Sequence, residues 1–169
     1  MDSNLSDHAL VARAARLIGI CIEKRIQIAT AESCTGGLLA GLLTEIPGSS
    51  AVLDRGFVTY SNDAKTQMIG VPADLIDLKG AVSAEVACAM AEGALRHSRA
   101  DLTIAITGIA GPGGGTPAKP VGLVHFARAS RSGTTQAYEK RFDEKGRADI
   151  RRAALDFALT LLEKEVAKA

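Results

Sequence analysis

The sequence predicts an α/β protein, a three-layer α/β/α sandwich on a mixed, mainly parallel sheet. Segments with apolar residues at helical spacing alternate with short β-branched runs, which indicates parallel strands joined by helical crossovers. The run LTIAIT at 102–107 is almost continuously apolar, as is typical of a strand in the middle of a sheet. Two alternating runs near the carboxyl end predict a hairpin, which adds an antiparallel part to the sheet.

The first part of the chain is predicted to form three helices and two strands. Apolar residues of the opening segment recur at helical spacing, with Ser6 as the N-cap and Asp7 in the first turn. A leucine stripe marks the second helix, and Gly70 ends the third. We expect helices over 6–24, from 38 to the break at 47–50, and over 62–69, and strands over 26–31 and 52–60.

The second part begins with a loop over 71–80, in which we expect one helical turn at most. A helix opens at Ser83, because its apolar positions recur at three and four residues. The glycines and prolines of 108–120 form a loop that is too long for a simple turn. Around this loop we expect strands over 101–107, 121–129 and 134–142, and a final amphipathic helix over 146–169.

Length and charge exclude several classes of protein. At 169 residues the chain predicts a single domain over 1–169, which buries roughly 70% of its unfolded surface. Lys and Arg exceed Asp and Glu by only one charge, so there is no basic face for nucleic acid. The opening residues lack a signal-peptide pattern, and no apolar run approaches the ~20 residues of a membrane span. We therefore expect a cytoplasmic protein with no nucleic-acid or membrane partner.

Ser33 is the first candidate for chemistry, because it follows the first predicted strand and precedes a helix that begins near Gly36 and Gly37. In open α/β sheets, ligands bind at the carboxyl ends of strands, where helix N-termini offer N–H groups to anions. A hydroxyl there can be a nucleophile whose oxyanion these N–H groups hold. Two alternatives remain open. Ser33 or Thr35 only caps the helix, or Cys34 supplies a thiol nucleophile.

A serine nucleophile needs a base. His8 and His97 lie on predicted helix surfaces and His125 lies within a strand, so a structural or solvated role is favoured for each. Lys65 lies on a short helix after the second strand, at the same edge of the sheet as Ser33. It serves as a base only where burial lowers its pKa from roughly 10.4 towards neutrality. The alternative for Lys65 is an ordinary solvated charge.

The stretch TGIAGPGGG at 107–115 is a second ligand candidate. It matches neither common glycine-rich phosphate motif, but its glycines allow a ligand to approach the backbone closely. The alternative is a surface loop that tolerates many sequences. Four arginines near the start of the last helix are expected to be mostly solvated: Arg141, Arg147, Arg151 and Arg152.

No metal site and no disulfide framework are predicted. Cys21, Cys34 and Cys88 have neither CxxC nor His-rich spacing. The aspartates at 54, 63, 74 and 77 do not show the spacing of metal ligands either. We therefore expect chemistry that uses no metal.

Several long motifs resemble the CinA C-terminal domain family. They are TAESCTGG at 30–37, PGSSAVLDRGFVTYSNDAKTQMIGV at 47–71, GAVS at 80–83, and TGIAGPGGG with KPVG within 107–122. The resemblance extends from about Ile26 into the last helix. The family includes stand-alone (PncC-like) members with nicotinamide mononucleotide (NMN) amidohydrolase activity, and longer members with an additional N-terminal domain. The resemblance therefore implies an amidase that converts NMN to nicotinate mononucleotide and ammonia in pyridine nucleotide recycling.

The resemblance also implies roles for particular residues. By motif, Ser33 is the nucleophile of a seryl acyl-enzyme, Lys65 is its base, and Tyr60 is a further active-site hydroxyl. No metal or other cofactor is implied. The substrate carries a 5′-phosphate, which implies contacts from the Gly-rich loop and from arginines of the last helix. The implied substrate-binding residues, with the N–H groups near 35–37 holding the oxyanion, are Thr35, Gly36, Gly37, Thr107, Gly108, Gly111, Gly113, Arg147 and Arg151.

Two classes of function remain at this point. One is the amidase, with NMN as its small-molecule partner. The other is a catalytically inactive module that binds pyridine nucleotides as a sensor or acts as a partner domain. The presence of Ser33, Tyr60 and Lys65 together favours the enzyme. A homodimer is expected from the resemblance and because small α/β domains often pair through helices.

Overall fold

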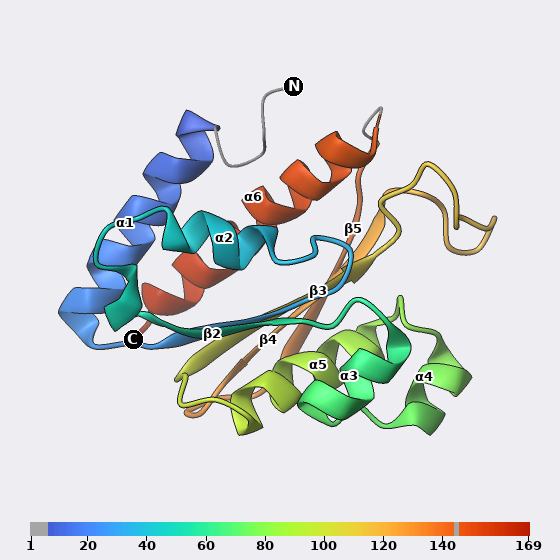
Figure 1. The fold of residues 1–169 in the computed structure, drawn as a ribbon, viewed down its shortest axis with the longest axis horizontal. Coiled ribbons are helices and arrows are strands. Elements are labelled where there is room, and N and C mark those ends of the chain that lie inside the picture. The colour runs from blue at the N-terminus through green and yellow to red at the C-terminus, as the bar shows by residue number, and fades with distance from the viewer. Residues whose placement is uncertain (1–6, 144–145) are drawn as a thin grey trace.

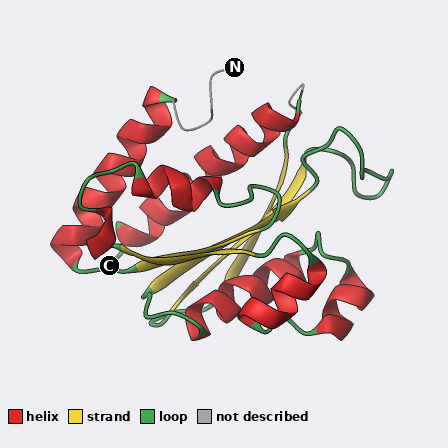
Figure 2. Ribbon diagram, viewed as in Figure 1, coloured by secondary structure: helices red, strands yellow, loops and turns green. Residues whose placement is uncertain are grey.

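Five strands form one sheet with helices on both faces, in a computed structural model that describes residues 7–143 and 146–169 (Figure 1, Figure 2). The order across the sheet is β2-β1-β3-β4-β5. β1 pairs in parallel with β2 and β3, and β4 runs antiparallel to β3 and β5. The predicted sandwich with a mixed sheet is confirmed, and β3 is central as expected. The strands are β1 Ile28–Glu32, β2 Leu53–Val58, β3 Leu102–Gly108, β4 Leu123–Ser130 and β5 Gln136–Arg141.

The helices divide into two layers. One face of the sheet carries α1 His8–Lys24, α2 Leu38–Thr44 and α6 Arg147–Val166, and the other carries α3 Asn62–Ile69, α4 Ala73–Lys79 and α5 Ala84–Arg96 (Figure 1). The core under the first layer is rich in leucine and isoleucine. The core under α5 contains many alanines, which bring this helix close to the strands. Among the described helices, none combines the length and apolar character that a bilayer crossing requires.

The structure corrects the prediction at the start of the first helix and in the segment 71–80. Asp7 was predicted in the first turn of the opening helix, but it is the N-cap of α1. Its carboxylate accepts the N–H groups of Ala9 and Leu10. Ser6, the predicted cap, lies outside the described residues. The segment 71–80 contains the seven-residue helix α4 instead of a single turn. Pro72 is compatible with the start of this helix, and buried Ile76 anchors it to the core.

The strand order creates a topological switch point at one end of the sheet. The chain leaves β1 through α2 on one face to reach β2, and it leaves β2 through α3, α4 and α5 on the other face to reach β3 (Figure 1). The chain therefore reaches the two strands beside β1 over opposite faces of the sheet. In open α/β sheets, this switch point at the carboxyl ends of the strands is where ligands bind. Ser33 directly follows β1 at this place.

Two helical glycines are expected to respond in opposite ways to an added methyl group. At Gly93 of α5 a Cβ would lie 2.0 Å from the carbonyl oxygen of Ile69, whereas at Gly19 of α1 it would meet nothing within 4 Å. Gly93→Ala should lower the free energy of unfolding by about 1–3 kcal/mol. Gly19→Ala should raise it by roughly 0.5–1 kcal/mol, because alanine favours the helix. Urea unfolding followed by circular dichroism measures both, and shifts of equal sign would contradict this packing.

Candidate functional site

Lys65 and Ser33 contact each other at the carboxyl end of β1. Lys65 Nζ lies 3.1 Å from Ser33 Oγ and also donates to the carbonyl oxygens of Thr59, at 2.9 Å, and Ser61, at 3.4 Å. The lysine side chain is only 1% exposed. Burial disfavours the charged form, so the pKa of Lys65 is lowered from its ordinary value. The predicted proximity and burial of Lys65 are confirmed, and the solvated alternative is wrong.

The short helix α3 places Lys65 by means of local sequence signals. Ser61 caps the helix by accepting the N–H of Ala64, and Gly70 ends it in the left-handed region, at φ 68°. Lys65 and Ile69 are four residues apart and form the buried side of the helix. Asp63 is exposed, and no carboxylate forms an ion pair with Lys65 among the described residues. The amine therefore has only neutral hydrogen-bond partners.

Ser33 is held by the sheet on both sides. Its N–H donates to the carbonyl oxygen of Ile106 in β3, and the N–H of Thr59 beyond β2 donates to the carbonyl oxygen of Glu32. The chain segment before Ser33 is thus bonded to both neighbouring strands. Thr59, which also accepts from Lys65, is therefore linked to β1 at the same level.

The turn after Ser33 uses some of its own N–H groups. Gly36 and Gly37 have φ values of 60° and 93°, a region that glycine enters freely. The N–H of Gly36 donates to the Ser33 carbonyl oxygen, and that of Gly37 donates to Glu32 Oε2. These two N–H groups are therefore engaged and do not suit the predicted oxyanion role. In the described part of the chain, the N–H groups of Cys34 and Thr35 do not donate to the backbone of another residue.

Tyr60 and two arginines border the same turn. Arg147 donates to the hydroxyl of Tyr60 and to the carbonyl oxygen of Gly111, each at 2.9 Å, and Arg151 donates to the carbonyl oxygen of Thr35 at 2.9 Å. Arg147 and Arg151 are one turn apart at the start of α6, so they share a face. Arg151 Nε and Thr35 Oγ1 are buried without a partner among the described residues. The structure thus brings five predicted residues together at the turn that carries Ser33. They are Thr35, Tyr60, Gly111, Arg147 and Arg151.

Three other predicted residues are not part of this arrangement. The hydroxyl of Thr107 is buried and donates to the Ala81 carbonyl oxygen at 2.7 Å, on the connection before α5. Gly108 is required by close packing within the sheet, because a Cβ there would lie 2.8 Å from the Leu123 carbonyl oxygen. Gly113 has open space around it. None of the three has a hydrogen bond to the Ser33 turn in the described structure.

Glu32 belongs to the site but has no part in the prediction. Its side chain is fully buried and accepts the N–H groups of Gly37, Leu39 and Ala40 at the start of α2. The available signal was a glutamate at the end of a short, mostly apolar strand, directly before the candidate nucleophile. A buried carboxylate at such a position needs donors, and the start of a helix provides them.

The histidines and acidic groups do not form an alternative centre within the described ranges. His97 Nδ1 lies 2.9 Å from the Gly93 carbonyl oxygen, and His125 Nε2 lies 3.8 Å from Glu139. Burial lowers the pKa of His125, so its neutral form is favoured. In residues 7–143 and 146–169, no three His, Cys, Asp or Glu side chains are grouped as metal ligands would be.

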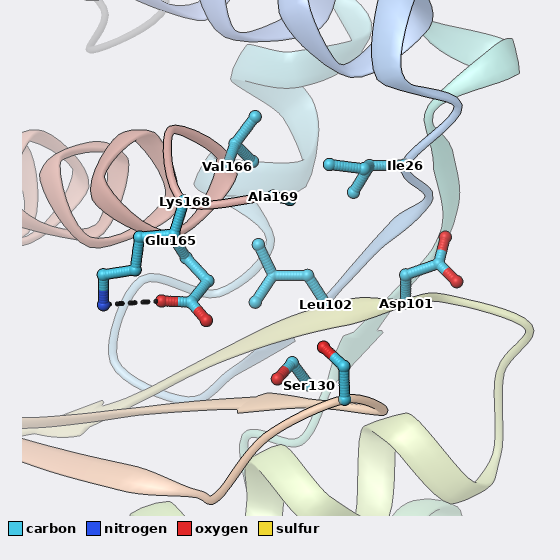
Figure 3. A pocket seen from close by; sticks show the side chains of 9 residues that line it. Ile26, Asp101, Leu102, Ser130, Glu165, Val166, Lys168 and Ala169 are labelled. Carbon is cyan, nitrogen blue, oxygen red and sulfur yellow. Dashed lines mark hydrogen bonds and ion pairs between the residues drawn. The ribbon is translucent and has the colours of Figure 1, made fainter.

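A separate pocket lies at the other end of the sheet. Asp101 and Leu102 line it at the start of β3, and Glu165, Val166 and Lys168 close it from the end of α6 (Figure 3). Lys168 pairs with Glu165 at 3.1 Å, as the dashed line shows (Figure 3). The pocket measures about 200 Å³. Ser33 and Lys65 do not line it, because they lie at the carboxyl ends of the strands.

Comparison with known proteins identifies chains that are similar to this one in sequence and in structure. The sequence model of the CinA C-terminal domain family matches residues 11–166. The crystal structure of the competence/damage inducible protein CihA from Agrobacterium tumefaciens is 52% identical, with a TM-score of 0.90, over 92% of this chain and 94% of that one. A CinA superfamily protein from Klebsiella pneumoniae is 34% identical, with a TM-score of 0.89, over 95% of this chain and 99% of that one.

Curated relatives are longer. A CinA-like protein from Mycolicibacterium gilvum is 55% identical over 137 residues, which are 81% of this chain and 32% of that protein. A competence-damage inducible protein from Caldicellulosiruptor bescii is 45% identical over 89% of this chain and 36% of its own length. The chain therefore spans about a third of the length of these curated relatives.

Cys34 should react more slowly than Cys88 in the folded protein, although it adjoins Ser33. Burial raises the pKa of Cys34 to about 12 and that of Cys21 to about 11. Cys88 is partly exposed, so iodoacetamide at pH 8 should modify it first. Peptide mass spectrometry gives the order of labelling, and all three should react in guanidinium chloride. Early labelling of Cys34 would indicate a thiol that is activated as a nucleophile.

Proposed function

The chain belongs to the CinA C-terminal domain family, and on this premise we propose that it hydrolyses the carboxamide of NMN. The products are nicotinate mononucleotide and ammonia, and the reaction proceeds through an acyl group on Ser33. The observation that carries the proposal is the 3.1 Å contact between Lys65 Nζ and Ser33 Oγ in a buried site. A hydroxyl beside a deprotonated amine has the pairing of nucleophile and base that acyl transfer requires.

The proposed reaction uses Lys65 twice. A neutral Lys65 accepts the hydroxyl proton while Ser33 Oγ attacks the carboxamide carbon. The protonated lysine then gives this proton to the amide nitrogen, which leaves as ammonia. In the second half, Lys65 takes a proton from water as the water attacks the acyl carbon. The bond between the acyl carbon and Ser33 Oγ then breaks, Lys65 returns the proton to Oγ, and nicotinate mononucleotide leaves, so that Ser33 and the neutral lysine are restored.

Backbone N–H groups next to Ser33 are proposed to hold the oxyanion. Among the described residues of the turn, the N–H groups of Cys34 and Thr35 do not donate to the backbone of another residue. Donors that are already in place stabilise the charge that develops in the transition state without reorganisation. Gly36 and Gly37 then serve the turn through their positive φ values.

The arginines of α6 are proposed to bind the 5′-phosphate. Guanidinium groups offer several donors in a fixed plane, which suits phosphate oxygens. Arg147 connects Tyr60 with Gly111, and Arg151 retains a buried Nε without a protein partner in the described structure. Tyr60 is 59% exposed and would contact substrate from the open side of the site.

The proposed function is tested by ammonia release from purified protein and NMN, without added metal. An amidase should release ammonia and nicotinate mononucleotide in equal amounts. NMN binding measured by calorimetry, without turnover above background, would instead support the inactive sensor. Absence of both binding and turnover would contradict both functions.

Ser33→Ala should abolish turnover and leave NMN affinity almost unchanged. We expect at least a 100-fold loss of kcat, whereas loss of one hydroxyl contact costs only roughly 0.5–1.5 kcal/mol of binding. Cys34→Ala is the matched control at the neighbouring position and should retain most of the activity. An inactive cysteine variant together with an active serine variant would assign the nucleophile to Cys34.

Lys65→Arg should be nearly as inactive as Lys65→Ala, because arginine stays protonated and cannot act as the base. We expect a loss of about 100- to 10,000-fold in kcat. The lowered pKa of Lys65 also sets the sign of the pH dependence. The amine accepts a proton only above this pKa, so kcat/KM should rise with pH and then level off below the ordinary lysine range. High activity of the arginine variant would require a different base.

A further inference from the structure

Glu32 has a buried carboxylate, and both of its oxygens accept N–H groups from the segment after Ser33. Oε2 accepts the N–H groups of Gly37 at 3.1 Å and Leu39 at 3.0 Å, and Oε1 accepts that of Ala40 at 2.9 Å. The hydroxyl of Thr30 donates to Oε1 at 3.2 Å. The Glu32 side chain is 0% exposed, so these contacts replace the hydration it has lost.

These contacts make Glu32 a cap that acts from upstream. The residue at the N-cap position of α2 is Gly37, which has no side chain to accept the first N–H groups of the helix. Glu32 accepts them instead, and its bond to Gly37 closes a loop around residues 33–36. The other end of this loop is fixed to β3 through the N–H of Ser33. The nucleophile therefore lies in a loop whose two ends are both anchored.

We propose that Glu32 is a positioning residue of the amidase, which fixes the turn 33–37 so that Ser33 stays aligned with Lys65 and the N–H groups of Cys34 and Thr35 stay free. The inference rests on the proposed function. By engaging the N–H groups of Gly37, Leu39 and Ala40, the carboxylate determines which donors remain for substrate. A displaced turn would also lengthen the 3.1 Å contact between the nucleophile and its base.

Glu32→Gln tests this inference with almost no change in shape. An amide has one acceptor oxygen, and its NH₂ group faces N–H donors that it cannot accept. We expect a 10- to 1,000-fold fall in kcat with NMN, because misplaced reacting groups and a lost oxyanion donor each cost about 100-fold or more. KM should change less than about threefold, since Arg147 bonds to Tyr60 and Gly111 and not to the turn 33–37. Ordinary loss of a cap would lower stability and leave kcat of the folded enzyme unchanged.

Asp54→Asn is the matched control. The Asp54 side chain is 4% exposed and accepts the N–H of Arg99 at 3.0 Å, at the start of β2 and so at the opposite end of that strand from Tyr60. This variant also converts a buried carboxylate that binds a backbone N–H into an amide. We expect lower stability with kcat within twofold of the wild type. An equal fall in kcat in both variants would reduce the role of Glu32 to general stability and overturn the inference.

Amide hydrogen exchange gives a readout that does not require turnover. In Glu32→Gln, the amides of Gly37, Leu39 and Ala40 should exchange at least tenfold faster, whereas in Asp54→Asn they should not. Unchanged exchange would overturn the inference whatever the kinetics show. Inactive wild-type enzyme would refute the proposed function, and the exchange would still decide whether Glu32 holds the turn.

Thr30→Val is a second variant in case Glu32→Gln does not fold. It removes one donor to Glu32 Oε1 and keeps the carboxylate. We expect a two- to tenfold fall in kcat and a smaller increase of exchange at Ala40, which donates to the same oxygen. Full activity together with faster exchange would show that turnover does not depend on the position of the turn, which would overturn the inference.

Discussion

The buried contact between Lys65 and Ser33 constrains the architecture of the whole site. A lysine amine loses its hydration when it is enclosed, and this favours the neutral form. Carbonyl oxygens of Thr59 and Ser61 accept from the amine without adding a formal charge that would hold the proton. Helix α3, the segment after β2 and the turn after β1 must therefore fit together within hydrogen-bond distance. The bond from the N–H of Thr59 to the carbonyl oxygen of Glu32 provides that connection.

The two helical layers contribute different side chains to the carboxyl end of β1. Lys65 comes from α3 on one face of the sheet, whereas Arg147 and Arg151 come from α6 on the other face. They can meet only where the connections from β1 and β2 pass over opposite faces and leave the strand ends open. Tyr60 joins the layers, since it follows β2 and bonds to Arg147. The fold thus places a buried lysine amine on one helical layer and two arginine side chains on the other, at the same strand end.

Signals from residues that are close in sequence explain which parts of the fold and the site could be predicted. Ser61 as cap and Gly70 as terminator define α3 at the predicted residues, and the strand-end rule brings Lys65 to Ser33. These signals do not predict where a side chain points once segments that are distant in sequence pack together. The hydroxyl of Thr107 bonds to Ala81, 26 residues away, and Arg147 reaches Tyr60, 87 residues away. Spacing alone therefore favoured solvated arginines, and only the resemblance to the family pointed to their place beside the turn.

The distribution of N–H groups after β1 limits which anion the backbone of the proposed site can bind. A helix N-terminus next to a candidate nucleophile suggests an anion site made by the backbone. Here Glu32 engages three of those donors, and its carboxylate adds negative character to the start of α2. The remaining free donors, at Cys34 and Thr35, suit the small charge of an oxyanion more than that of a phosphate group. In the proposed function, attraction for the 5′-phosphate therefore comes from α6, where the guanidinium groups of Arg147 and Arg151 lie beside the turn.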